Sequence, residues 1–150
     1  MTIGIKVVVI DDVRKHPDAD RLTIVSTEGH EVVANLQDDG TPRWKTGEVA
    51  IYVPENAIIP EDVLKERGYW DEAKGKGFLG GSKGNRVKMQ RFVGFESRGL
   101  LFKVEVVADG QGYHYVIRRG DAWQLFLTLD DTPSSERLAS LFGLTEFIPE

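Results

Sequence analysis

Residues 22–35 read LTIVSTEGHEVVAN and predict a β-hairpin near the start of the chain. The two halves, LTIVST and HEVVAN, are rich in β-branched residues, which favour extended backbone. Glu28 and Gly29 between them match a tight two-residue turn, because glycine accepts the positive φ that such turns require. This hairpin therefore makes an antiparallel β fold the first expectation.

The segments on either side of the hairpin extend the same pattern. Further strands are predicted at residues 3–13, 48–54, 86–97, 99–107, 113–119 and 123–129, and short helices after Pro60 and over SSERLASLFG (134–143). Several short strands with one helix late in the set favour a mainly β chain. We expect an OB-fold-like five-stranded barrel with a short helix, with a β-sandwich as the alternative. Residues 1–105 would form the OB-fold nucleic-acid-binding domain and residues 106–150 a C-terminal extension of strands and a short helix.

Composition sets limits on location and chemistry. The 150-residue chain is 41% hydrophobic and has no cysteine, so disulfides and thiolate zinc sites are excluded. No apolar run reaches the ~20 residues of a membrane span, and the first ten residues lack the features of a signal peptide. We therefore expect a cytoplasmic protein without a membrane partner.

Charge is unevenly distributed along the chain. The net charge is −5, yet residues 74–103 carry +7 and the remainder −12. A basic stripe on an acidic body is typical of phosphate binders, although a solvated surface loop explains the pattern about equally well. The predicted RNA-contacting residues are Lys15, Lys74, Lys76, Lys83, Arg86, Lys88, Arg91 and Arg98.

Within the stripe, Arg86, Lys88 and Gln90 would share one face of a strand, with Val87 and Met89 on the other. Phe92 or Phe95 could stack on a base, but a place in the core is the commoner fate of a strand phenylalanine. This alternation predicts a sheet with one basic, solvent-facing side.

The segment KHPDADRL (15–22) admits three interpretations: half of a metal site, an acid/base pair or a turn. His16, Asp18 and Asp20 lack the further ligands that a zinc site needs. Adjacent acidic pairs elsewhere would point to opposite faces of a strand. The turn is favoured, with aspartate side chains bonding nearby backbone N–H groups. We therefore assign no catalytic residue and no metal ligand, while Arg14, Lys15 and His16 remain candidates to touch RNA at the rim.

The segment DEAKGKGFLGGSKGN (71–85) contains five glycines and no periodicity. It lacks the spacing of a phosphate-binding loop and leads into a strand and not a helix, so a Walker-type nucleotide site is not expected. A flexible loop is predicted, with lysines on a compliant backbone that can follow a nucleic-acid strand or remain a plain surface loop.

Four segments in order resemble known families. KHPDADRL (15–22) and NRVKMQRFVGFESRGLLF (85–102) look like the opening and closing motifs of OB-type tRNA-binding modules, as on the β chain of bacterial phenylalanyl-tRNA synthetases. GEVAIYVPENAIIPEDVL (47–64) and ERLASLFGLTEFIPE (136–150) resemble ATP-dependent RNA ligases that carry an OB domain N-terminal to the nucleotidyltransferase domain. The resemblance covers residues 6–105 and 136–150.

The chain departs from those ligases in one respect. They use a lysine in a K-x-D-G motif, but neither DDG (38–40) nor ADG (108–110) has a lysine two places before its aspartate. The resemblance thus implies an N-terminal domain that does not adenylate by itself. It also implies that ATP and Mg belong only to a catalytic domain absent from this chain, supplied in cis or in trans.

The family resemblance further implies a role. The domain would bind RNA, as a nicked duplex or a tRNA-like structure, and position the ends for nick sealing. Two alternatives stay open: a freestanding tRNA-binding module, and a protein-interaction domain whose basic loop binds an acidic partner.

Overall fold

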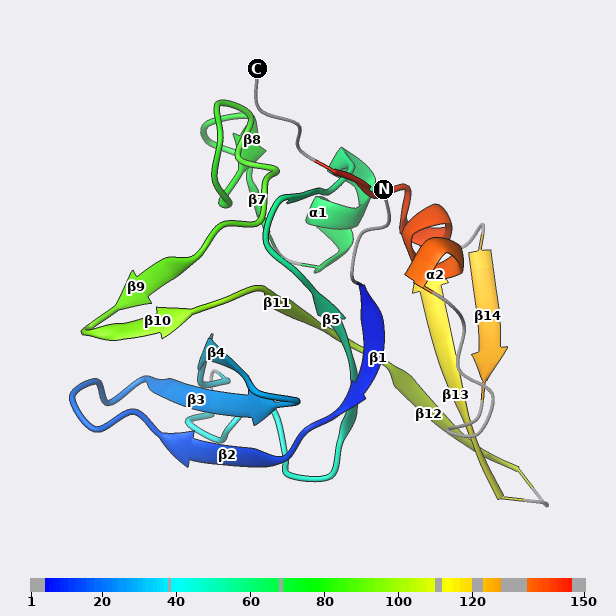
Figure 1. The fold of residues 1–150 in the computed structure, drawn as a ribbon, viewed down its shortest axis with the longest axis horizontal. Helices are drawn as coiled ribbons and strands as arrows, with labels where there is room; N and C mark the ends of the chain where they lie inside the picture. Colours follow the sequence, from blue (N-terminus) through cyan, green and yellow to red (C-terminus); the bar gives the residue numbers. More distant parts are fainter. Residues whose placement is uncertain are drawn as a thin grey trace.

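The computed structural model describes residues 5–37, 39–67, 69–109, 112–119, 123–127 and 135–146. The strands are β1 (Lys6–Val9), β2 (Asp12–Lys15), β3 (Leu22–Thr27), β4 (His30–Asn35), β5 (Val49–Val53), β6 (Ala57–Ile58), β7 (Trp70–Asp71), β8 (Lys76–Gly77), β9 (Gln90–Phe92), β10 (Phe95–Ser97), β11 (Leu100–Lys103), β12 (Glu105–Asp109), β13 (Gly112–Arg119), β14 (Trp123–Leu127) and β15 (Thr145–Glu146). The helices are α1 (Glu61–Arg67) and α2 (Ser135–Phe142). Figure 1 shows their arrangement. Across these described ranges, neither helix is long and apolar enough to cross a bilayer.

The predicted hairpin forms as expected. Strands β3 and β4 pair in antiparallel register from Leu22 opposite Asn35 to Thr27 opposite His30. Glu28 and Gly29 have φ values of 45° and 83°, as a two-residue hairpin turn of type I′ requires. Strand β2 adds to the other edge of β3 and completes a three-stranded sheet.

The strand predicted at 3–13 is divided between two sheets. Ile10 donates its backbone N–H to the carbonyl of Glu48, just before β5, whereas the next N–H, of Asp11, bonds to Ser26 on β3. The chain therefore leaves the β1-β5-β11 sheet at this point and enters the β2-β3-β4 sheet. One bent segment thus links the two sheets.

The mainly β class with a short helix is confirmed, but the described strands do not close a barrel. Strand β10 lies beside β4, yet its only backbone bond to β4 is from the Arg98 N–H, just beyond its end, to the Glu31 carbonyl at 2.9 Å. The barrel stays open because β10 pairs with β9 in its own hairpin, while β11 turns away to pair with β5. The ring of strands is left open between β4 and β11.

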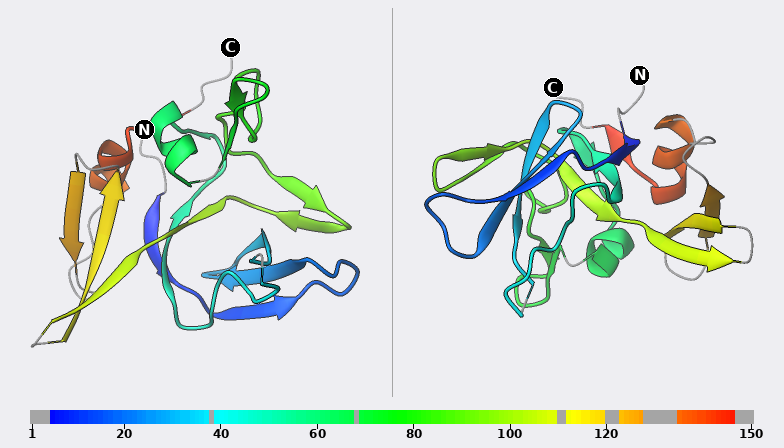
Figure 2. Two further views of the ribbon diagram at one scale, coloured as in Figure 1. Left: turned by 180° about the vertical axis from the view of Figure 1, so that it is seen from behind. Right: turned by 90° about the horizontal axis from the view of Figure 1, so that it is seen from below.

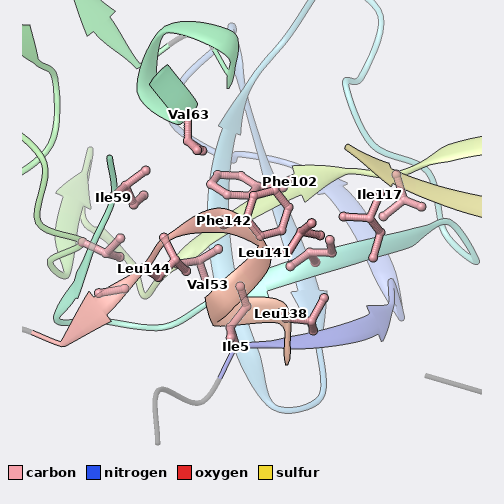
Figure 3. Packing of buried hydrophobic residues seen from close by; sticks show 14 of the residues in the cluster. Ile5, Val53, Ile59, Val63, Phe102, Ile117, Leu138, Leu141, Phe142 and Leu144 are labelled. Atoms are coloured by element: carbon pink, nitrogen blue, oxygen red, sulfur yellow. The ribbon is translucent and has the colours of Figure 1, made fainter. Parts of the chain in front are cut away.

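Helix α2 supplies one wall of the larger core (Figure 3). Leu138, Leu141 and Phe142 are buried at a helical spacing and pack with residues of β1, β5, α1 and β11. The rings of Phe102 and Phe142 meet edge to face, with centroids 5.4 Å apart. Burial of each such side chain contributes roughly 1.5–3 kcal/mol. A second cluster, around Val25, Trp44 and Tyr52, lies between the two sheets.

Beyond β11 the chain forms a further sheet, β12-β13-β14. This sheet and α2 lie on the side of the molecule opposite the β9–β10 hairpin in every view (Figures 1 and 2). After α2 the chain returns, and β15 pairs with β6 through Thr145 opposite Ile58. Residues before and after position 105 therefore share the larger core.

Candidate nucleic-acid interface

The segment Ser97-Arg98-Gly99 holds the open side of the ring together. The Ser97 side-chain oxygen accepts a hydrogen bond from the Val33 backbone N–H at 2.9 Å. The Tyr52 hydroxyl donates to the Arg98 carbonyl at 2.8 Å. Gly99, with φ of 98°, passes so close to the Tyr52 ring that a Cβ would lie 2.7 Å from it. This part of the closing motif therefore has a structural role.

Two of the predicted RNA-contacting arginines are engaged in ion pairs. Arg98 contacts Glu96 at 2.8 Å and Glu55 at 3.3 Å, and Arg91 contacts Glu96 at 3.3 Å. Hydrogen bonds from Arg98 and Arg91 hold the pKa of Glu96 below its ordinary value, and Glu96 raises the pKa of Arg98. The positive charge expected at this bend is therefore largely balanced.

The glycine-rich segment differs from the flexible loop predicted for it. Residues 69–88, here named the glycine-rich lobe, carry β7 and β8 and a series of backbone hydrogen bonds. Gly77 donates to Lys83 at 3.1 Å, and Gly80 and Arg86 exchange bonds of 2.8 and 3.0 Å. The two backbones cross so tightly that a Cβ on Gly84 would lie 1.9 Å from the Gly77 carbonyl oxygen. Glycine is needed here because the lobe folds on itself, not because it is loose.

The lobe presents its lysines to solvent. Lys74, Lys76, Lys83 and Lys88 are all exposed, and Arg86 is half-buried. The Lys88 side chain lies across Gly80, where a Cβ would come within 2.4 Å of it. The predicted alternation holds for buried Val87 and exposed Lys88, although residues 87–89 are not in a strand. The lobe thus brings most of the predicted basic residues together.

The KHPDADRL segment forms a turn, as predicted, but the side chain that accepts a backbone hydrogen bond in it is a histidine and not an aspartate. His16 is 1% exposed, and its Nδ1 accepts a hydrogen bond from the Asp18 backbone N–H at 3.0 Å. Its ring meets Phe95 edge to face at 4.8 Å, which places the turn against the β9–β10 hairpin. The expectation that His16 touches RNA is wrong, since its ring is buried. Exposed Lys15 lies beside this contact.

The side chain of Phe92 lies outside the described residues. Phe95 is half-buried against His16 and so takes the packing role. Arg14, the other candidate at this rim, is paired with Glu31 and Asp12.

A groove of about 690 Å³ lies where the ring of strands is open. Its lining combines the end of β4 and all of β11 with residues of the glycine-rich lobe and the end of α1. Its lining includes Arg43, Trp44, Tyr69, Phe78, Leu79 and Lys88. Sequence reasoning missed Arg43, Trp44 and Phe78; the available signal was an aromatic residue inside an otherwise polar loop.

Cations and aromatic rings are interleaved at the base of the groove. The Lys103 ammonium lies 4.1 Å from the Trp44 ring centroid and pairs with Glu48 at 2.9 Å. Arg67 donates to the Lys103 carbonyl, and burial lowers the pKa of its guanidinium. Burial raises the pKa of Tyr69, an effect partly offset by nearby Arg43 and Arg67. Cationic and aromatic side chains therefore lie together at the base of the groove, with Glu48 balancing the charge of Lys103.

The fold is similar to part of a known enzyme. Naegleria gruberi RNA ligase with PPi matches with a TM-score of 0.61 at 15% identity, over 100% of this chain and 36% of that one. A mutant of the same ligase with ATP and Mn matches with a TM-score of 0.58 at 16% identity, over 97% of this chain and 36% of that one. The chain thus spans about a third of the ligase. No protein-family model matches the sequence, and no curated protein does.

Proposed function

We propose that this chain is the RNA-binding OB domain of an ATP-dependent RNA ligase, and that it positions RNA ends for a nucleotidyltransferase domain. The observation that carries the proposal is the likeness of almost the entire chain to about a third of an RNA ligase. At 15–16% identity that likeness concerns the fold, so the assignment to RNA also draws on the sequence motifs and on the charge of the lobe.

The strand order supports the OB part of the proposal. Strands β2, β3 and β4 are neighbours, β10 lies beside β4, and β11 continues through β5 back to β1. The OB fold is a five-stranded, partly open Greek-key barrel. The open side between β4 and β11 fits that description. Residues 1–105 would then be the barrel and 106–150 its extension.

The glycine-rich lobe is the proposed contact with RNA phosphates. Its four exposed lysines, at positions 74, 76, 83 and 88, form no ion pair with a described residue. Arg91 and Arg98 contribute less, because glutamates already neutralise them. ATP and Mg would act in the nucleotidyltransferase domain and not on this chain.

The test is a fluorescence-anisotropy titration of the chain with a nicked RNA duplex, an intact duplex and a tRNA. We expect tightest binding to the nicked duplex, and weaker binding after Lys74, Lys76, Lys83 and Lys88 are replaced by alanine. Lys6→Ala is the control, since Lys6 lies on β1, outside the lobe, and already pairs with Glu28. Preference for tRNA by a dimer would favour a freestanding tRNA-binding module. No RNA binding at low salt would contradict the proposal and favour a protein partner.

A further inference from the structure

Among the residues whose exposure the structure describes, Phe78 is the most exposed large hydrophobic residue, at 59%. The other exposed members of that set, Val9, Val93 and Val106, are aliphatic. A single exposed hydrophobic residue needs no functional explanation. Phe78 differs from the valines in its surroundings, because it lines the groove together with Arg43 and Lys88, two cations that form no ion pair with a described residue.

The backbone that carries Phe78 is held in place. Its own N–H donates to the Tyr69 carbonyl at 2.9 Å, and the flanking N–H groups of Gly77 and Leu79 bond to Lys83 and Gly84. Each of these bonds lies within the glycine-rich lobe. These bonds hold the backbone that carries the ring. The exposure of the ring therefore does not result from a loose chain. A fixed support lowers the entropy cost of stacking on a ligand.

Two exposed cations line the same groove. Arg43 comes from the loop after β4, and Lys88 lies at the end of the lobe. Neither forms an ion pair with any described residue. Glu66 is the one acidic residue in the described lining. The groove thus combines an open aromatic face with positive charge, the two components with which proteins bind unpaired nucleotides.

The size of the groove agrees with this use. Its volume of about 690 Å³ lies within the roughly 300–1,000 Å³ usual for small-ligand sites. A base inside an intact helix has both faces covered by its neighbours, so only an unpaired base can offer a face to Phe78.

We propose that the groove between β11 and the glycine-rich lobe binds an unpaired RNA nucleotide, with its base stacked on Phe78 and its phosphates beside Arg43 and Lys88. This inference rests on the proposed function and specifies which part of the RNA the groove would recognise. Lysines elsewhere on the lobe would then contact the phosphates of the adjoining RNA, and the groove would hold a nucleotide released from pairing at the RNA end.

The experiment uses a duplex RNA with a short single-stranded overhang that carries 2-aminopurine, and the same duplex with the probe paired. Stacking quenches 2-aminopurine fluorescence. We expect the wild-type chain to quench the overhang probe and to leave the paired probe unchanged. Base–aromatic stacking is strong enough that Phe78→Ala should weaken overhang binding roughly 5- to 100-fold and abolish the quenching. Phe78→Trp should retain both.

Two controls separate stacking from general surface effects. Val106→Ala removes a hydrophobic side chain of 56% exposure from β12 and should change nothing. Arg43→Ala and Lys88→Ala should each weaken binding and reduce the slope of log K against log salt by the amount expected for about one phosphate contact. The complex that still forms should retain the quenching. Thermal melts confirm that each variant is folded.

The two proposals fail in different ways. If Phe78→Ala quenches and binds like wild type, base stacking in the groove is wrong, while salt-dependent binding of RNA would still support the proposed function. If the wild-type chain binds neither RNA at low salt, both are overturned.

Discussion

The Ser97 side-chain oxygen accepts the Val33 backbone N–H at 2.9 Å and thereby joins β10 to β4, two strands that share almost no backbone pairing. Ser97 is 5% exposed, so no solvent molecule readily replaces it. A serine in a G-x-x-S-x-G motif could be taken for a nucleophile. Here its role is to hold the open side of the ring.

Replacement of Ser97 by alanine should therefore destabilise the fold. Loss of the acceptor leaves the Val33 N–H without its partner, at a cost of about 1–3 kcal/mol. Urea unfolding measures the change, with Ser82→Ala on the exposed surface of the lobe as the control. An unchanged urea midpoint for Ser97→Ala would show that the hydrogen bond does not stabilise this contact.

The crossing of Gly77 and Gly84 gives a second prediction. Gly84 and Gly75 both have φ of 65°, but only at Gly84 would a Cβ collide with backbone. Both alanine variants bear the strain of positive φ, roughly 1–2 kcal/mol, and Gly84→Ala also forces the lobe apart. Hydrogen exchange at the Gly77 and Leu79 amides should therefore speed up much more in Gly84→Ala than in Gly75→Ala. Equal protection in the two variants would contradict the crossing.

The turn at KHPDADRL gives a third prediction. His16→Ala removes a buried ring, its contact with Phe95 and the acceptor for the Asp18 N–H, so we expect a loss of about 2–4 kcal/mol. Asp20 is exposed, and Asp20→Ala should stay within about 0.5 kcal/mol. Thermal unfolding compares the two. A larger loss for Asp20→Ala than for His16→Ala would restore the aspartate-based turn predicted from the sequence.

The Glu96–Arg98 pair predicts a pH dependence. The pKa of Glu96 is lowered in the fold from its ordinary 4.5, so the pair stabilises the protein above that value and loses its effect as acid protonates the carboxylate. The difference in unfolding free energy between wild type and Glu96→Gln should be present at neutral pH and shrink below pH 4.5. Glu72→Gln, which removes an exposed carboxylate without a described ion pair, is the control. A difference that grows in acid would contradict the assignment.

Local patterns were enough to predict several elements. Strands β3 and β4 and helix α1 agree with the sequence prediction, because a turn, a proline or an alternation marks their ends within a few residues. The division of the first strand at Ile10 could not be predicted, since it depends on bonds to Glu48 and Ser26 from distant segments.

The candidate site was predicted in part for the same reason. The basic stripe is a local feature of composition, so its lysines were found from the sequence. The groove joins Arg43 to Phe78, which are far apart in the chain, and the pairing of Arg98 with Glu55 also depends on the fold. Such relationships have no signature in a short window of sequence.

The central claim is that the chain binds RNA through the lysines of the glycine-rich lobe. Its most direct test is the affinity for a nicked RNA duplex as a function of salt, for the wild-type chain and for the variant with Lys74, Lys76, Lys83 and Lys88 replaced by alanine. Each phosphate contact contributes about 0.7–0.9 to the slope of log K against log salt. We predict a steep negative slope for wild type, reduced by roughly 3 in the variant. The same slope for both proteins would contradict the claim.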